Sequence, residues 1–214
     1  MRPKQIVIDL DDADPNGVFV DQQLEGAGDF DLDGAGVVGG VWVTPDGFAK
    51  RIGLESSGNM SGVNFTLVGF ADLIRNIPVT ETLAGANNGT AETVNYFAVI
   101  TQISADDEVA TDLEAGPVDE AVSQIIPLNW RGGNVAINVT VVGTVEYTVQ
   151  QTFDDFNVGA PYPFAWDDHD DAELVAATAT KNGNYIAIPR GMRVKVNSYS
   201  TGAALTINVS QSDV

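Results

Sequence analysis

The chain contains no cysteine, a single histidine and no long apolar run. The lack of cysteine excludes disulfides, thiolate catalysis and every zinc or iron–sulfur site that needs a cysteine ligand. No apolar stretch approaches the roughly 20 residues of a membrane-spanning helix, and the N-terminal stretch "MRPKQIVIDLDD" lacks the apolar core of a signal peptide. We therefore expect a soluble protein that is not secreted, does not bind a membrane and is assembled in the cytoplasm.

Basic residues are scarce as well. Ten Lys and Arg stand against 30 Asp and Glu, which gives a formal net charge of −20. Nucleic-acid binding needs clustered Lys and Arg that displace counterions from phosphates, so we expect no nucleic-acid partner. Acidity of this kind is typical of a soluble surface that resists non-specific association. It would also suit docking onto a basic surface of a partner, or bound divalent cations.

The chain is rich in turn signals and strand patterns. In "SSGNMSGVNFTLVG", residues 56–69, glycine and serine predict a tight turn, and Phe65 and Leu67 then alternate with polar neighbours. A period of two over β-favouring residues predicts a half-buried strand. Helix signals are nearly absent, and we expect residues 70–77 to form a loop or a single turn.

Similar strand-like runs, separated by turns such as Asn-Gly and Gly-Gly, extend along the whole chain. They cover residues 4–10, 41–44, 50–56, 63–69, 77–84, 96–104, 123–128, 134–142, 144–153, 174–181, 193–200 and 204–212. Short strands at such spacing are typical of sandwiches and jelly rolls. The sequence therefore predicts an all-β protein with two antiparallel β-sandwich or jelly-roll-like domains.

An acidic segment, residues 104–121, contains Gly116-Pro117 and separates two groups of strands. It predicts an N-terminal domain of residues 1–115 and a C-terminal domain of residues 116–214. A single domain with a long crossing loop is the alternative. Residues 1–20 could form an arm that adds a strand to a neighbour's sheet edge, or they could pair within the first sheet of their own domain.

The segment "DFDLDG", residues 29–34, opens like a calcium-binding loop, with Asp29, Asp31 and Asp33 at the first ligand positions. The position of the loop's bidentate glutamate is Gly40, and no helices flank the segment. We favour a strand with a polar outer face, and the three aspartates remain weak metal candidates.

The segment "WDDHDDAE", residues 166–173, holds the single histidine among four aspartates. Asp167, His169 and Asp170 could ligate a metal, but catalytic zinc usually takes two or three nitrogen ligands. We favour a solvated acidic loop and predict no metal site.

No arrangement typical of an enzyme stands out. No G-x-S-x-G motif surrounds any serine, and "GAGVVGG", residues 34–40, has neither a following helix nor a Walker lysine. Paired carboxylates for glycoside hydrolysis remain open, because acidic residues occur throughout the chain. We expect no catalytic residues and no cofactor, and we interpret the three tryptophans as core or interface anchors.

Residues 51–109 resemble a pattern found in virion structural proteins of tailed bacteriophages. The residues that carry it are Ser57, Gly58, Ser61, Gly62, Phe65, Thr66, Gly69, Thr80, Glu81, Gly85, Tyr96 and Phe97. Residues 143–155 and 182–211, with Trp166 and His169, are similar to a module that follows in such proteins, and residues 26–34 resemble one of their glycine-flanked strands.

The resemblance implies a non-enzymatic particle component, first of all a capsid decoration (cement) protein on the outer surface of a phage head. Its partners would be the major capsid protein and further copies of itself, with a trimer as the leading expectation. We expect contacts through Ile6, Ile8, Phe19 and Trp42. A tail, head–tail or fibre component is the first alternative, and a carbohydrate-binding module or glycan hydrolase is the second.

Overall fold

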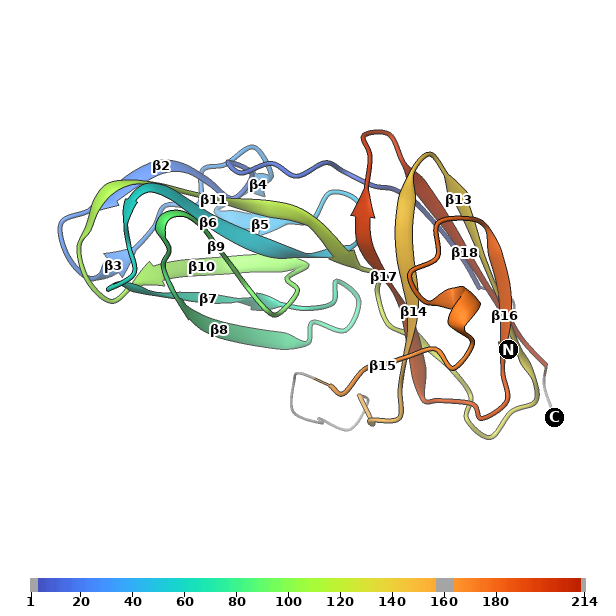
Figure 1. The fold of residues 1–214 in the computed structure, drawn as a ribbon. Coiled ribbons are helices and arrows are strands. Elements are labelled where there is room, and N and C mark those ends of the chain that lie inside the picture. Colours follow the sequence, from blue (N-terminus) through green and yellow to red (C-terminus); the bar gives the residue numbers. More distant parts are fainter. Residues whose placement is uncertain (1–3, 157–163, 213–214) are drawn as a thin grey trace. The chain divides into compact units, whose positions relative to one another are not determined.

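The computed structural model describes residues 4–156 and 164–212, and the regular elements there are β-strands apart from one short 3-10 helix (Figure 1). Neighbouring strands pair in antiparallel fashion in several sheets. The predicted all-β, sandwich-like class is therefore confirmed. No helix in the described ranges is long and apolar enough to cross a membrane.

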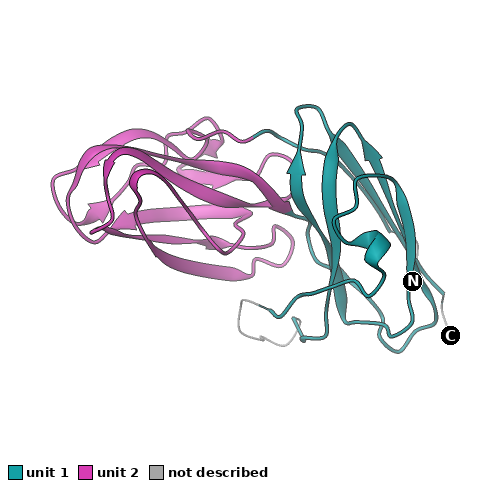
Figure 2. Cartoon of the chain, in the orientation of Figure 1, with its two compact units in different colours: residues 1–12, 122–214 teal, residues 13–121 magenta. Residues whose placement is uncertain are grey.

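The chain divides into two compact units (Figure 2). Unit 1 comprises residues 1–12 and 122–214, and unit 2 comprises residues 13–121. The predicted domains, 1–115 and 116–214, differ from these units in two places. The N-terminal residues belong with the C-terminal half of the chain, and the second boundary falls at the end of a strand and not inside an acidic linker.

Unit 2 contains two groups of paired strands. One sheet has the order β4 (Val37–Val38), β5 (Val41–Val43), β10 (Val99–Ala105), β7 (Asn64–Phe70), β8 (Pro78–Ala84), with β3 (Gly28–Asp29) also on β10. The other group consists of β2 (Phe19–Leu24), β11 (Val109–Val122), β6 (Ala49–Asn59) and β9 (Asn87–Glu92). β7 follows the predicted alternation, because Phe65 and Leu67 are fully buried whereas Asn64 is exposed.

Aromatic side chains fill the core of unit 2. The rings of Phe19 and Phe30 stack with centroids 4.7 Å apart, and Phe65 lies 6.3 Å from Phe30. Phe48 and Phe97 are also fully buried. Stacked and tilted aromatic pairs add to the large apolar area that such side chains remove from water, so this cluster fixes how the strands of unit 2 pack.

The longest strand, β11, lies in the segment that the sequence indicated as a linker. Its inward side chains are small or apolar, including Val109, Leu113 and Ala115, whereas Asp112 and Asp119 are exposed. Because acidic residues occupy many of the other positions, the sequence of this segment looks like a charged linker and not like a strand. β9 was missed for a related reason: "NNGTAE" has turn composition, yet it pairs with β6 from Gly53 to Asn59.

Unit 1 is also built from two groups of strands. One sheet has the order β1 (Lys4–Asp9), β18 (Ala204–Gln211), β13 (Val135–Val142), β16 (Lys181–Tyr185). The other group has the order β15 (Asp167–Asp168), β14 (Val145–Thr152), β17 (Gly191–Tyr199), with β12 (Ile126–Pro127) on β17. Val, Ile and Leu side chains from β13, β14, β17 and β18 form the core.

The N-terminal strand pairs with the last strand of its own chain. β1 runs antiparallel to β18, from Lys4 opposite Val209 to Asp9 opposite Ala204. This pairing corrects both expectations for the segment, because the strand neither extends as a free arm nor joins the sheet of residues that follow it.

One predicted strand, residues 174–181, is wrong. The chain there forms the 3-10 helix η1 (Ala172–Leu174) and an irregular stretch before β16 begins at Lys181. Leu174 is fully buried, and a Cβ added at Gly183 would lie 2.3 Å from its Cδ1. The helix therefore packs onto β16 only because residue 183 has no side chain.

Candidate interaction surfaces

The segment expected to form a strand with a polar outer face, residues 29–34, is a strand only at its first residue. The strand β3 ends at Asp29, and the following residues form a loop held by Gln22. The Gln22 amide donates to the Asp31 carbonyl oxygen at 2.7 Å and accepts from the Asp31 N–H at 3.0 Å. Asp33 accepts from the Val20 N–H, and Asp29 accepts from the Gln102 amide. These aspartates close a loop in unit 2.

The second acidic segment places its histidine in the core. His169 is 5% exposed, its backbone N–H donates to the Val149 carbonyl, and its ring Nδ1 accepts from the Asp171 N–H at 3.0 Å. The expectation of a solvated loop is therefore wrong for His169, although Asp167 and Asp170 are exposed. The hydrogen bond from its backbone N–H to β14 holds the residue against the sheet, directly after the two exposed residues of β15.

The His169 ring lies against Tyr185 with centroids 4.7 Å apart. Neither His169 Nε2 nor the Tyr185 hydroxyl has a hydrogen-bond partner within the described ranges. Burial lowers the pKa of His169, opposed by the charges of Asp171 and Asp170, and burial raises the pKa of Tyr185. The two rings therefore pack against each other in their uncharged forms.

The weak metal candidates do not converge on a site. Across residues 4–156 and 164–212, no group of three or more His, Asp or Glu side chains could hold a metal ion. Asp29, Asp31 and Asp33 belong to unit 2, whereas Asp167, His169 and Asp170 belong to unit 1.

The four residues expected to contact partners are core residues. Ile6 and Ile8 face the interior of unit 1, and Phe19 and Trp42 are almost fully buried in unit 2. The folded chain itself covers their side chains, so a contact with another protein would have to use other residues.

The negative charge is unevenly divided. Unit 2 has 18 acidic and three basic residues, a formal charge of −15, whereas unit 1 has 12 acidic and seven basic residues, a formal charge of −5. All three cations of unit 2 form ion pairs within it: Lys50 with Asp46, Arg51 with Glu92 and Glu120, and Arg75 with Asp72. The remaining carboxylates give unit 2 a strongly anionic surface.

A depression of about 250 Å³ lies on the outer face of β6, β9 and β11 in unit 2. The residues that line it are Ala13, Pro15, Gly53, Glu55, Thr90, Glu92, Gly116, Pro117 and Val118. Glycine lines this depression where space is limited. A Cβ at Gly53 would contact Thr90 at 2.9 Å, and residues 13–17 cross directly over Gly116.

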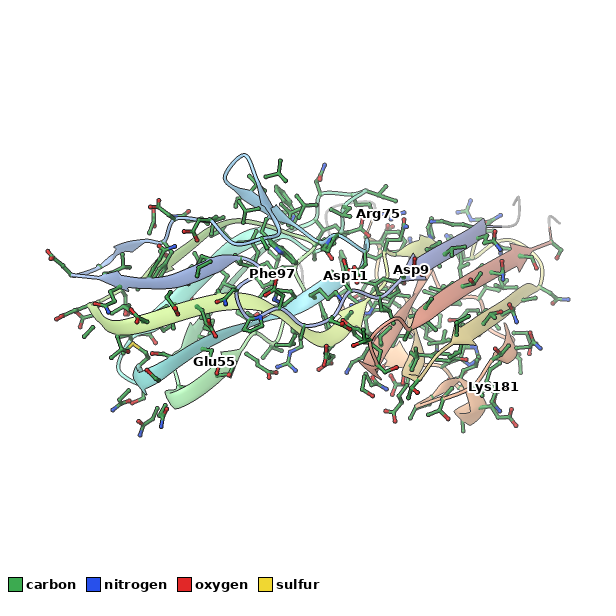
Figure 3. All side chains as sticks on the ribbon, turned by 90° about the horizontal axis from the view of Figure 1, so that it is seen from above. Asp9, Asp11, Glu55, Arg75, Phe97 and Lys181 are labelled. Carbon is green, nitrogen blue, oxygen red and sulfur yellow. The ribbon has the colours of Figure 1, made fainter. Side chains whose placement is uncertain are left out.

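Acidic side chains surround this depression. The Glu55 carboxylate, exposed on β6 (Figure 3), has no hydrogen-bond or ion-pair partner among the residues that the structure describes. Close by, burial and the charges of Asp21, Glu55 and Asp14 raise the pKa of Glu114. Like charges therefore repel one another here, and an approaching cation would relieve that repulsion.

Unit 1 has an exposed aromatic residue surrounded by cations. Trp130 is 50% exposed, and the guanidinium carbons of Arg131 and Arg190 lie 4.5 and 5.5 Å from its ring centre. Arg190 also pairs with Asp155 at 2.5 Å, whereas the Arg131 guanidinium has no carboxylate partner in the described ranges. The sequence singled out Trp130 as an anchor and places Arg131 beside it, but Arg190 comes from a separate part of the chain.

The turn that presents Trp130 is firmly attached to the sheet. The Asn129 N–H donates to the Gln211 side-chain oxygen at 2.9 Å, and the Gln211 amide donates back to the Asn129 carbonyl at 2.7 Å. Gly132 N–H then donates to the same carbonyl. Trp130 and Arg131 thus project from a short turn anchored at the end of β18.

An uncharged row of amides crosses the outer face of the first sheet of unit 1. Asn208, Asn138 and Asn182 lie opposite one another on β18, β13 and β16, and each amide donates to the next, at 3.1 and 2.8 Å. The row lies in a shallow depression of about 380 Å³. Sequence periodicity places these residues outward, but only the strand register aligns them.

No family model matches the chain, and no curated protein matches it. Among solved structures, a chain of the "Cryo-EM Atomic Structure of Broad Bean Stain Virus (BBSV)" aligns with 98% of this chain and 88% of its own length. The sequence identity is 8% and the TM-score is 0.19, a level of likeness that carries no argument about fold or function.

Proposed function

We propose that this protein is a non-enzymatic structural component of a virus particle, namely a decoration (cement) protein on the outer surface of a tailed-phage head. In this role it binds the major capsid protein and further copies of itself and strengthens the junctions between capsomers. It assembles in the host cytoplasm as a homo-oligomer, for which a trimer is the first expectation.

The observation that carries the proposal is the position of the residues that resemble phage virion proteins. Glu81, on β8, accepts hydrogen bonds from the N–H groups of Val94 and Asn95 at 2.7 and 2.8 Å. It thereby holds the loop that leads to Phe97, whose side chain is fully buried. The Thr-Glu and Tyr-Phe parts of the pattern are thus coupled in the fold, although 14 residues separate them.

The glycines of the same pattern are equally structural. A Cβ at Gly69 would lie 1.9 Å from the Val99 carbonyl oxygen, and one at Gly85 would lie 2.6 Å from the Met60 Cβ. The matching residues therefore build the framework of unit 2. The likeness to virion proteins thus rests on framework residues, and it supports a shared scaffold from which we infer the particle role.

The fold suits attachment to a large assembly. Edge strands β1 and β16 of unit 1 each leave one side unpaired in the described part of the chain, and an unpaired strand edge is a ready template for a partner strand. Val7 on β1 and Val38 on β4 are exposed apolar side chains. Covering such groups between capsomers would contribute about 25 cal/mol per Å² of apolar area, summed over many copies.

Cryo-electron microscopy of the particles that carry this protein tests the proposal. Density that fits units 1 and 2 at threefold or quasi-threefold positions of the head is the expected result. Density confined to the tail or neck would replace decoration with a tail or head–tail role. Particles without any such density would overturn the structural role and return glycan binding, tested on a glycan array, to consideration.

A further inference from the structure

We propose that copies of this chain associate head to tail, with the Trp130–Arg131 turn of unit 1 docking into the Glu55-rimmed depression of unit 2 on a second copy. The interface deepens the proposed function and rests on its self-association. It names the two surfaces that meet and the residues that hold them together.

The first argument is chemical complementarity. The depression combines an apolar floor, formed by Pro15, Pro117 and Val118, with the Glu55 carboxylate at its rim. The turn combines a half-exposed indole with the Arg131 guanidinium beside it. Trp and Arg are the side chains most enriched at interface hot spots, where an aromatic anchor fills a pocket and a charge pair excludes water around it.

The second argument is charge. A chain of net charge −20 repels its copies wherever two acidic surfaces meet. The Arg131 guanidinium lacks a carboxylate within the described residues, and Glu55 likewise lacks a cation there. Bringing the two together across copies pairs both groups, whereas contact between two units 2 would oppose charges of −15.

The third argument concerns preorganisation. The Trp130 turn is tied to Gln211 by two hydrogen bonds, and the depression is bounded by backbone, because residues 13–17 are fixed on β11 by the Asp14 N–H to Pro117 carbonyl bond. Surfaces that are already ordered lose little conformational entropy on binding. The contact joins different surfaces, so successive copies either close into a ring, such as a trimer, or continue as a filament.

Sedimentation velocity on the full chain over a concentration series tests this interface. We expect the wild type to associate, and Trp130→Ala, Arg131→Glu and Glu55→Lys each to raise the dissociation constant by about tenfold or more. The double variant Arg131→Glu/Glu55→Lys restores the exchanged charge pair and should recover most of the association. Circular dichroism confirms that each variant folds.

Two matched controls separate this contact from general charge effects. Glu108→Lys makes the same charge change on an exposed residue of unit 2, and Val142→Ala removes an exposed apolar side chain of unit 1. Both should associate like the wild type. A wild type that stays monomeric at about 100 µM, where only a weak complex would be dissociated, would overturn the interface, as would association unaffected by Trp130→Ala and Glu55→Lys.

The test of this interface and the test of the decoration role can fail independently of each other. Rescue by the charge exchange, combined with particles that carry no density for the chain, would retain the interface and reject decoration. Density on the head, combined with variants that associate normally, would retain decoration and reject the interface.

Discussion

The ammonium group of Lys50 lies 2.7 Å from the carboxylate of Asp46, and both side chains are only 1% exposed. Asp46 also accepts hydrogen bonds from the Thr44 hydroxyl and the Phe48 N–H. A buried ion pair of this kind holds the start of β6 in place, because neither charge can return to water without unfolding this part of unit 2.

Removing one partner of that pair should be costly. We expect Asp46→Ala to reduce the free energy of unfolding of unit 2 by about 3–5 kcal/mol, since it removes the carboxylate that faces the buried Lys50 ammonium group. Urea denaturation followed by the fluorescence of Trp42, the tryptophan of unit 2, measures the change. As a control, Glu173→Ala breaks the more exposed pair with Lys181 and should cost at most about 1 kcal/mol. Equal effects of the two substitutions would contradict the prediction.

The N-terminal strand should stabilise unit 1. Ile8 is 6% exposed and lies opposite Leu205 of β18. We expect Ile8→Ala to lower the free energy of unfolding of unit 1 by about 2–5 kcal/mol, the usual range for such a core truncation. The exposed neighbour Val7→Ala is the matched control and should change stability little. If residues 4–9 served as a free arm, both variants would unfold like the wild type.

Glycine at position 69 should be required for folding. Because a Cβ there would overlap the Val99 carbonyl oxygen, Gly69→Ala must separate β7 from β10. We expect a loss of about 3 kcal/mol or more in the free energy of unfolding of unit 2, at or beyond the upper range for overpacking. Gly26→Ala places a methyl group where no atom lies within 4 Å, and should be tolerated. Comparable melting temperatures for the two variants would disprove the close approach.

Acid should destabilise unit 1 through His169. Burial holds the folded-state pKa of His169 below its ordinary value, so the unfolded chain takes up the proton first as the pH falls. Its contribution to stability is complete above about pH 6.5 and is lost as the pH falls from there through the folded-state pKa. His169→Asn keeps an acceptor for the Asp171 N–H and should show a flatter pH dependence in urea titrations.

The same histidine provides a direct measurement, because the chain has only one. Its ring resonances in an NMR titration should move at a pH below about 6.5, the ordinary histidine value. A midpoint at or above that value would mean that the Asp170 and Asp171 charges outweigh burial, and the predicted acid sensitivity of unit 1 would be withdrawn.

Local patterns in the sequence predict the class of fold and most strand positions. Phe65 and Leu67 alternate with polar neighbours on β7 as predicted, and turn residues mark the ends of most strands. Charge was readable too, since net charge is a sum over residues. These properties are local or additive, and hence a single sequence contains them.

Only the folded chain establishes which strands pair with each other. β1 and β18 lie at opposite ends of the chain. Because backbone N–H and C=O groups are alike in every strand, nothing in the local sequence of β1 indicates which strand it pairs with. The burial of His169 and the Lys50–Asp46 pair likewise depend on which surfaces other strands cover. Arg131 follows Trp130 directly in the sequence, but Arg190 is distant, and only the folded backbone brings it to the same ring.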